Sequence, residues 1–210
     1  MYNLLSIIFI NFLVFFNQKI YCENVFFPNL PIGEYHIKFK AGFKCNSSIH
    51  YKIDLNLHQS KIASSKTVIT GNMSFHIPLD DSLIVDVNVA VLDKIGGWKD
   101  NAYVFQILNA CSAGLSILGP AAYKTLFKSF NATDDSCPIK ANSYYLMNNL
   151  DVDSFVDTIL KTNKMAPKTL FYGSYKAKLM HKRKDYDEIL SCFVIIFDVT
   201  RPWEDSYHYQ

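Results

Sequence analysis

The fold is decided by the stretch IHYKIDLNLH, which runs from Ile49 to His58. Every odd-numbered position in it is apolar and every even-numbered position is polar. Successive side chains of a β-strand point to opposite faces of its sheet, so this alternation predicts a strand with one buried and one solvated face. Asp54 and the other polar residues are expected on the solvated face.

The same alternation recurs along the chain. Further strands are predicted over residues 35–40, 72–77, 83–91, 103–107, 171–179 and 190–199. The last of these is apolar on both faces, which is expected of a strand in the centre of a sheet. Turn residues such as Gly96-Gly97 separate the strands, and this arrangement predicts an all-β sandwich or barrel.

One segment has helical periodicity instead. Between Pro120 and Phe130, the apolar residues Tyr123, Leu126, Phe127 and Phe130 fall on one helical stripe. Proline is well tolerated in the first turn of a helix, so we expect one short amphipathic helix there. A second helical turn is possible over 151–160.

Composition excludes some classes of protein. The chain has 210 residues, of which 50% are hydrophobic and 15% aromatic, and its formal net charge is +2. Such a chain has enough apolar material for a core, which argues against disorder. The balanced charge argues against a nucleic-acid binder.

The amino-terminal residues predict export. The apolar run from Leu4 to Phe16 is too short for a membrane span and has the length of a signal-peptide core. We expect residues 1–22 to be a signal peptide cleaved after Cys22, and residues 23–210 to form a single secreted, extracellular domain. An uncleaved amino-terminal anchor is the alternative.

Cysteines and glycosylation sequons agree with an extracellular location. Cys45, Cys111, Cys137 and Cys192 would remain after cleavage, an even number that is compatible with two disulfides. Their spacing does not suggest a zinc site. Sequons for N-glycosylation begin at Asn46, Asn72 and Asn131.

Motifs of the common enzyme classes are missing from the sequence. It contains no GxSxG, HExxH, P-loop or GxGxxG segment, so we expect no enzymatic activity, no catalytic residues, no metal site and no cofactor. The pairs Asp80-Asp81 and Asp134-Asp135 indicate solvated loops, with Ca²⁺ coordination as the alternative. The histidines are expected at the surface. The basic run His181–Lys184 predicts a hairpin tip, or else a contact with anionic lipid headgroups.

The order of features in the second half resembles a known family. Asn109-Ala110-Cys111 follows a strand, the amphipathic helix comes next, and Ser136-Cys137-Pro138 and the strand around Gly173-Ser174-Tyr175 follow. This order resembles the secreted insect proteins related to the lipid-recognition (ML) domain and the ganglioside-activator protein, most of them without an assigned role. The similarity covers about residues 49–199.

The resemblance implies an immunoglobulin-like antiparallel β-sandwich that admits a hydrophobic ligand between its two sheets. It also implies a disulfide between Cys111 and Cys137, which leaves Cys45 to pair with Cys192. Some relatives are linked to chemosensation.

We therefore expect a secreted binding protein for a lipid, sterol-like or pheromone-like molecule. A membrane receptor or a lipid surface is a further possible partner, and nucleic acid is not. Strand and helix parity gives the candidate ligand-lining residues, which are Phe75, Val87, Val89, Phe105, Leu126 and Phe127. The alternative is an extracellular protein–protein interaction module with a filled core and no ligand cavity.

Overall fold

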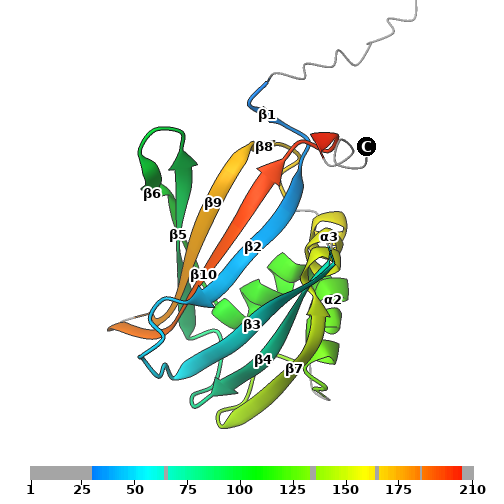
Figure 1. Cartoon of the computed structure of the whole chain (residues 1–210). Helices are drawn as coiled ribbons and strands as arrows, with labels where there is room; N and C mark the ends of the chain where they lie inside the picture. Colours follow the sequence, from blue (N-terminus) through cyan, green and yellow to red (C-terminus); the bar gives the residue numbers. More distant parts are fainter. Residues whose placement is uncertain (1–29, 64–65, 133–135, 164–165, 185, 205–210) are drawn as a thin grey trace, which may run out of the picture. The chain divides into compact units, whose positions relative to one another are not determined.

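The computed structural model describes residues 30–63, 66–132, 136–163, 166–184 and 186–204. Residues Pro31–Gln210 form one compact unit, to which all that follows refers. The predicted signal peptide lies outside the described residues. The elements are, in chain order, β1 (Ile32–Gly33), β2 (His36–Lys44), β3 (Ile53–Ala63), β4 (Lys66–Phe75), β5 (Leu83–Asp93), β6 (Gly97–Ile107), α2 (Ala110–Ser129), β7 (Ser143–Asp151), α3 (Val152–Thr162), β8 (Leu170–Phe171), β9 (Gly173–Arg183) and β10 (Tyr186–Thr200) (Figure 1).

The strands form antiparallel sheets, as the alternating sequence predicted. A five-stranded sheet has the order β2-β10-β9-β5-β6, and a three-stranded sheet has the order β3-β4-β7. The short strands β1 and β8 pair separately. The all-β sandwich with two disulfides is therefore confirmed. Strand β10 lies between β2 and β9, which confirms that the apolar stretch 190–199 is a central strand.

Among the described residues, α2 contains the helix predicted from Pro120 to Phe130, and α3 lies where a second helical turn was considered over 151–160. Helix α2 bends at Gly119, whose φ of 75° and ψ of 160° are not helical, and the predicted helix begins just after it at Pro120. The first half of α2 was missed because its small residues and leucines show no clear stripe. Helix α3 begins after Asp151, whose side chain accepts a hydrogen bond from the backbone N–H of Ser154 at 3.1 Å and caps the helix.

The core lies where both sheets meet α2. Val85 and Val87 come from the five-stranded sheet, and Ile53 and Phe75 come from the three-stranded sheet. Phe127 of α2 packs into the same cluster of buried side chains. Burial of side chains from both sheets and from α2 holds the sandwich and the helix together.

Both disulfides implied by the family resemblance are present. Cys111 at the start of α2 bonds to Cys137, with a Cα–Cα distance of 5.9 Å. Cys45, just after β2, bonds to Cys192 of β10, with a Cα–Cα distance of 5.4 Å. The first disulfide fixes the amino end of the helix and the second fixes the chain where it leaves the larger sheet.

The prediction for Asp54 was wrong. It lies on the polar side of β3, yet its side chain is buried and forms an ion pair with Lys44 of β2, with 2.7 Å between Lys44 Nζ and Asp54 Oδ1. Lys44 also donates a hydrogen bond of 3.3 Å to Asn56 Oδ1. Sequence parity assigns Asp54 to the outer face but does not reveal that β2 crosses beside it. The ion pair therefore joins the two sheets directly.

We predict that Asp54→Ala lowers the free energy of unfolding by about 3 kcal/mol, because it leaves the largely buried Lys44 cation without a carboxylate partner. The double variant Lys44→Met/Asp54→Leu removes both charges and is expected to recover most of that loss. Chemical denaturation of the three proteins measures the effect. A double variant no more stable than Asp54→Ala would contradict the role of the ion pair.

Candidate functional site

The candidate site is a row of apolar side chains on the inner face of β6, the face that continues the core. Ile107 lies opposite Val85, and Phe105 lies opposite Val87. Residues opposite each other on neighbouring strands share a face, so the β6 side chains point the same way as the buried core valines. Tyr103 continues the row opposite Val89.

The side chains of this row become more exposed to solvent with distance from the core. Ile107 is partly buried and packs against the core cluster, whereas Phe105 is 51% exposed and Tyr103 is 49% exposed. Strand β6 is the last strand of the larger sheet, at the side away from β2 (Figure 1). The other sheet and α2 cover Val85 and Val87 but leave the end of this face open. Large apolar side chains on a core-facing surface therefore remain accessible.

The six residues predicted to line a ligand cavity lie in different environments. Phe75, Val87 and Phe127 are fully buried in one core cluster, where they touch protein rather than a cavity. Val89 is partly buried against that cluster, and Leu126 is partly buried against a second one. Phe105 was expected to be enclosed and is half-exposed, because parity gives its face but not its place on an edge strand. Only Phe105 and Val89 are thus close to the open part of the inner face.

A small cavity lies between the sheets near the opposite edge. Its lining residues are Phe39, Gly42, Leu57, His58, Gln59, Ile69 and Phe193. Its volume is about 10 Å³, which is about the space of a single water molecule. Pockets for small organic ligands measure roughly 300–1,000 Å³, so this cavity cannot hold a lipid.

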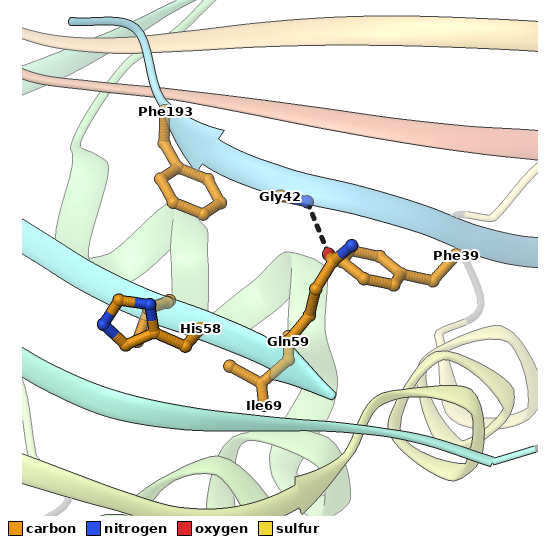
Figure 2. A pocket seen from close by; sticks show the side chains of 7 residues that line it. Phe39, Gly42, His58, Gln59, Ile69 and Phe193 are labelled. Carbon is orange, nitrogen blue, oxygen red and sulfur yellow. Dashed lines mark hydrogen bonds between the residues drawn. The ribbon is translucent and has the colours of Figure 1, made fainter. Parts of the chain in front are cut away.

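Hydrogen bonds tie the two sheets together at this cavity. The Gln59 side chain accepts a hydrogen bond from the Gly42 backbone N–H at 3.0 Å and donates one to the Lys40 carbonyl at 3.1 Å. Figure 2 shows the rings of Phe39 and Phe193 on either side of the bond between Gly42 and Gln59. A Cβ on Gly42 would lie 3.2 Å from the Phe193 ring, so glycine allows this close packing. This edge of the sandwich is closed.

His181 is an exception to the expected surface placement of the histidines. It lies opposite Val85 in the β5–β9 pair and so faces the core. Its Nδ1 atom is buried and has no hydrogen-bond partner among the described residues. Burial lowers the pKa of His181 from its ordinary value of 6.5 to about 4, because the charged imidazolium loses its hydration.

Lys182, the next residue of the basic run, is tied to acidic neighbours. The residues of the run span the end of β9, close to the turn into β10, which agrees with the predicted hairpin. Lys182 Nζ lies 3.0 Å from Asp86 and 3.7 Å from Asp187. The Gln106 hydrogen bond and the Lys182 ammonium both lower the pKa of Asp86. Lys182 is therefore engaged within the protein.

Asp81 has a structural role. It accepts hydrogen bonds from the Ser112 backbone N–H at 2.8 Å and from the Ser112 hydroxyl at 2.5 Å, so it caps the first turn of α2. These bonds lower the pKa of Asp81. Asp134 and Asp135 lie outside the described residues. Within the described ranges, no three His, Cys, Asp or Glu side chains are grouped to hold a metal ion.

The predicted glycosylation sites differ in exposure. Asn46 and Asn131 are exposed. Asn72 is partly buried in β4, and its Oδ1 accepts a hydrogen bond of 3.3 Å from Asn56. Glycans at Asn46 and Asn131 would meet less hindrance than one at Asn72.

Comparison with known proteins does not identify the chain. No protein-family model matches the sequence, and no curated protein matches it. The resemblance to ML-like proteins stays a prediction. None of the described helices has the length and apolar character needed to cross a membrane.

We predict that His181 makes the protein less stable as the pH falls. In the unfolded chain His181 becomes protonated below about pH 6.5, whereas in the folded chain it stays neutral down to about pH 4. The free energy of unfolding therefore declines as the pH falls from 6.5 to 4. The decline due to His181 is about 3 kcal/mol at most. His181→Leu should lose this part of the pH dependence, as measured by denaturant unfolding at pH 7 and pH 4.5. Equal pH dependence in the wild type and the variant would show that His181 does not cause it.

Proposed function

We propose that this chain is a secreted binding protein for a hydrophobic small molecule such as a lipid, a sterol-like or a pheromone-like compound. The ligand lies against the inner face of the larger sheet at its β6 end. The observation that carries the proposal is the half-exposed pair Tyr103 and Phe105, which continues the buried core face without cover.

Burial of this pair supplies the binding free energy. Each Å² of apolar surface removed from water contributes about 25 cal/mol, and one aromatic side chain presents 150–250 Å² in general. Covering the exposed halves of Tyr103 and Phe105 is therefore worth about 4 kcal/mol before the ligand's own buried surface is counted. The Tyr103 hydroxyl can give a polar ligand end one hydrogen bond.

The ligand cannot use the closed edge of the sandwich. The cavity there is about 10 Å³ and Gln59 bonds across it. Along the open row, by contrast, Ile107 and the neighbouring Val89 are only partly buried. We place the ligand on the open side, where partly covered side chains can adjust to it.

The disulfides support export. Cysteines persist as disulfides in oxidising compartments, and Cys45–Cys192 and Cys111–Cys137 fit an extracellular protein. Together with the signal-like run at residues 4–16, this supports secretion.

A second candidate function is an interaction module that binds another protein without any ligand. The observation that favours it is the small size of the cavity between the sheets, about 10 Å³, which is what a filled core would give. In that case, the open row on β6 would be part of a protein interface.

We predict that protein secreted from eukaryotic cells binds a fluorescent fatty acid, and that native mass spectrometry detects a hydrophobic molecule that leaves on denaturation. Tyr103→Ala and Phe105→Ala should each weaken binding of the probe about tenfold, because each removes apolar contact area. Fluorescence titration measures the dissociation constant.

Tyr144→Ala is the matched control. Tyr144 is also a half-exposed tyrosine on an edge strand, but it lies next to the core-facing Tyr145 and so points to the outer face of its sheet. Its removal should leave binding unchanged. Absence of both a co-purified molecule and probe binding would favour the interaction module. An equal loss in Tyr144→Ala would place the ligand elsewhere.

A further inference from the structure

The free edge of β6 is the starting observation. Its residues Ala102–Leu108 read AYVFQIL, seven residues without a charge, a proline or a glycine. Of these, Tyr103–Ile107 pair with β5 in unbroken register, and no described strand pairs with the other side of β6. Val104, on the outer face, is 66% exposed. A regular apolar edge with unpaired backbone groups is a template for another strand.

The other edge of the same sheet is protected. Strand β2 carries Lys38, Lys40 and Lys44, and charges on an edge strand oppose pairing. The Gln59 amide also occupies the Gly42 N–H and the Lys40 carbonyl. The contrast within one sheet singles out β6 as the edge left open to a partner strand.

In the smaller sheet, edge strand β3 lies beside β2, and the other edge strand, β7, is less regular than β6. In β7, the register against β4 shifts after Met147, and Asn149 has a positive φ of 50°. Helices α2 and α3 also contact this strand. A β-bulge in an edge strand, or helices packed against it, hinder the pairing of that strand with a strand of another molecule. On β6, the register shift lies at Asn101, just before the uncharged run begins.

We propose that two copies of this chain pair antiparallel through β6, about a two-fold axis at Val104, and join their five-stranded sheets into one continuous sheet. In this register, Val104 lies opposite the partner copy's own equivalent, and Tyr103 lies opposite the equivalent of Phe105. Aromatic cross-strand pairs of this type stabilise a sheet.

Charge supports a second copy as the occupant. The nearest charged residue, Asp100, falls opposite the equivalent of Leu108, and Lys99 falls opposite the equivalent of Asn109. When two identical β6 strands pair in this way, no two charges of the same sign lie opposite each other. A two-fold interface requires such self-complementarity.

Charge variants at Val104 test the pairing and its register. Analytical ultracentrifugation of the delipidated full protein is expected to show a dimer that dissociates on dilution. Val104→Lys and Val104→Glu each place like charges opposite each other, and each should raise the dimer dissociation constant about tenfold or more. An equimolar mixture of the two variants pairs opposite charges and should restore dimers.

Leu146→Lys is the matched control, since Leu146 is an exposed apolar residue on the outer face of edge strand β7. It should dimerise as the wild type does. A wild type that stays monomeric at every attainable concentration, or dimers that persist in both charge variants, would overturn the proposal. A mixture that fails to recover would overturn the register.

Folding of each variant is checked by circular dichroism. A second measurement uses Val104→Cys, which a short bifunctional thiol reagent should cross-link between copies because the two Cβ atoms would lie about 5 Å apart. Failure to cross-link would contradict the axis at Val104.

The test of the dimer is separate from that of the ligand, because Val104→Lys keeps Tyr103 and Phe105. A monomeric Val104→Lys protein that binds the fatty-acid probe would support both proposals independently.

Discussion

The ion pair between Lys44 and Asp54 is the contact on which the arrangement of the two sheets depends. It crosses from the edge of the larger sheet to the edge of the smaller one, and both side chains are largely removed from water. A charge left alone there would be strongly destabilising, so the pair admits only structures in which β2 lies beside β3. Gln59 continues the same junction through hydrogen bonds to β2. On the β6 side, by contrast, the core-facing surface reaches solvent at the half-exposed Tyr103 and Phe105.

The disulfides reinforce the same division between a closed and an open side. Cys45 and Cys192 are 147 residues apart in sequence, and their bond locks the end of β2 to β10 at the closed side. Cys111 and Cys137 are 26 residues apart, and their bond holds the start of α2. In the chain-entropy model such bonds contribute about 5 and about 3.5 kcal/mol, respectively. Neither bond involves β6, which is held by its pairing with β5 and by the burial of Ile107.

Side-chain parity predicted most strands and their buried faces, because a period of two is a local property of the sequence. It assigned Phe105 to the face that also carries Val87, and the register confirms this face. It could not show that β6 ends the sheet, since strand order depends on long-range pairing. The same limit explains Asp54, whose burial follows from the crossing of β2. The first half of α2 was missed for another reason, because Gly119 breaks the helix and separates it from the amphipathic stripe.

Strand β6 can serve both proposed roles because the ligand would cover its inner face, whereas the second copy would bind along its edge. A ligand contacts the side chains of Tyr103 and Phe105 on the inner face, whereas a second copy pairs with the backbone at the edge. In a dimer, the two inner rows would meet and form one apolar surface with twice the number of exposed aromatic side chains. A ligand that covers part of both rows would bind the dimer more tightly than the monomer. By linkage, that ligand would strengthen the dimer by the same free energy.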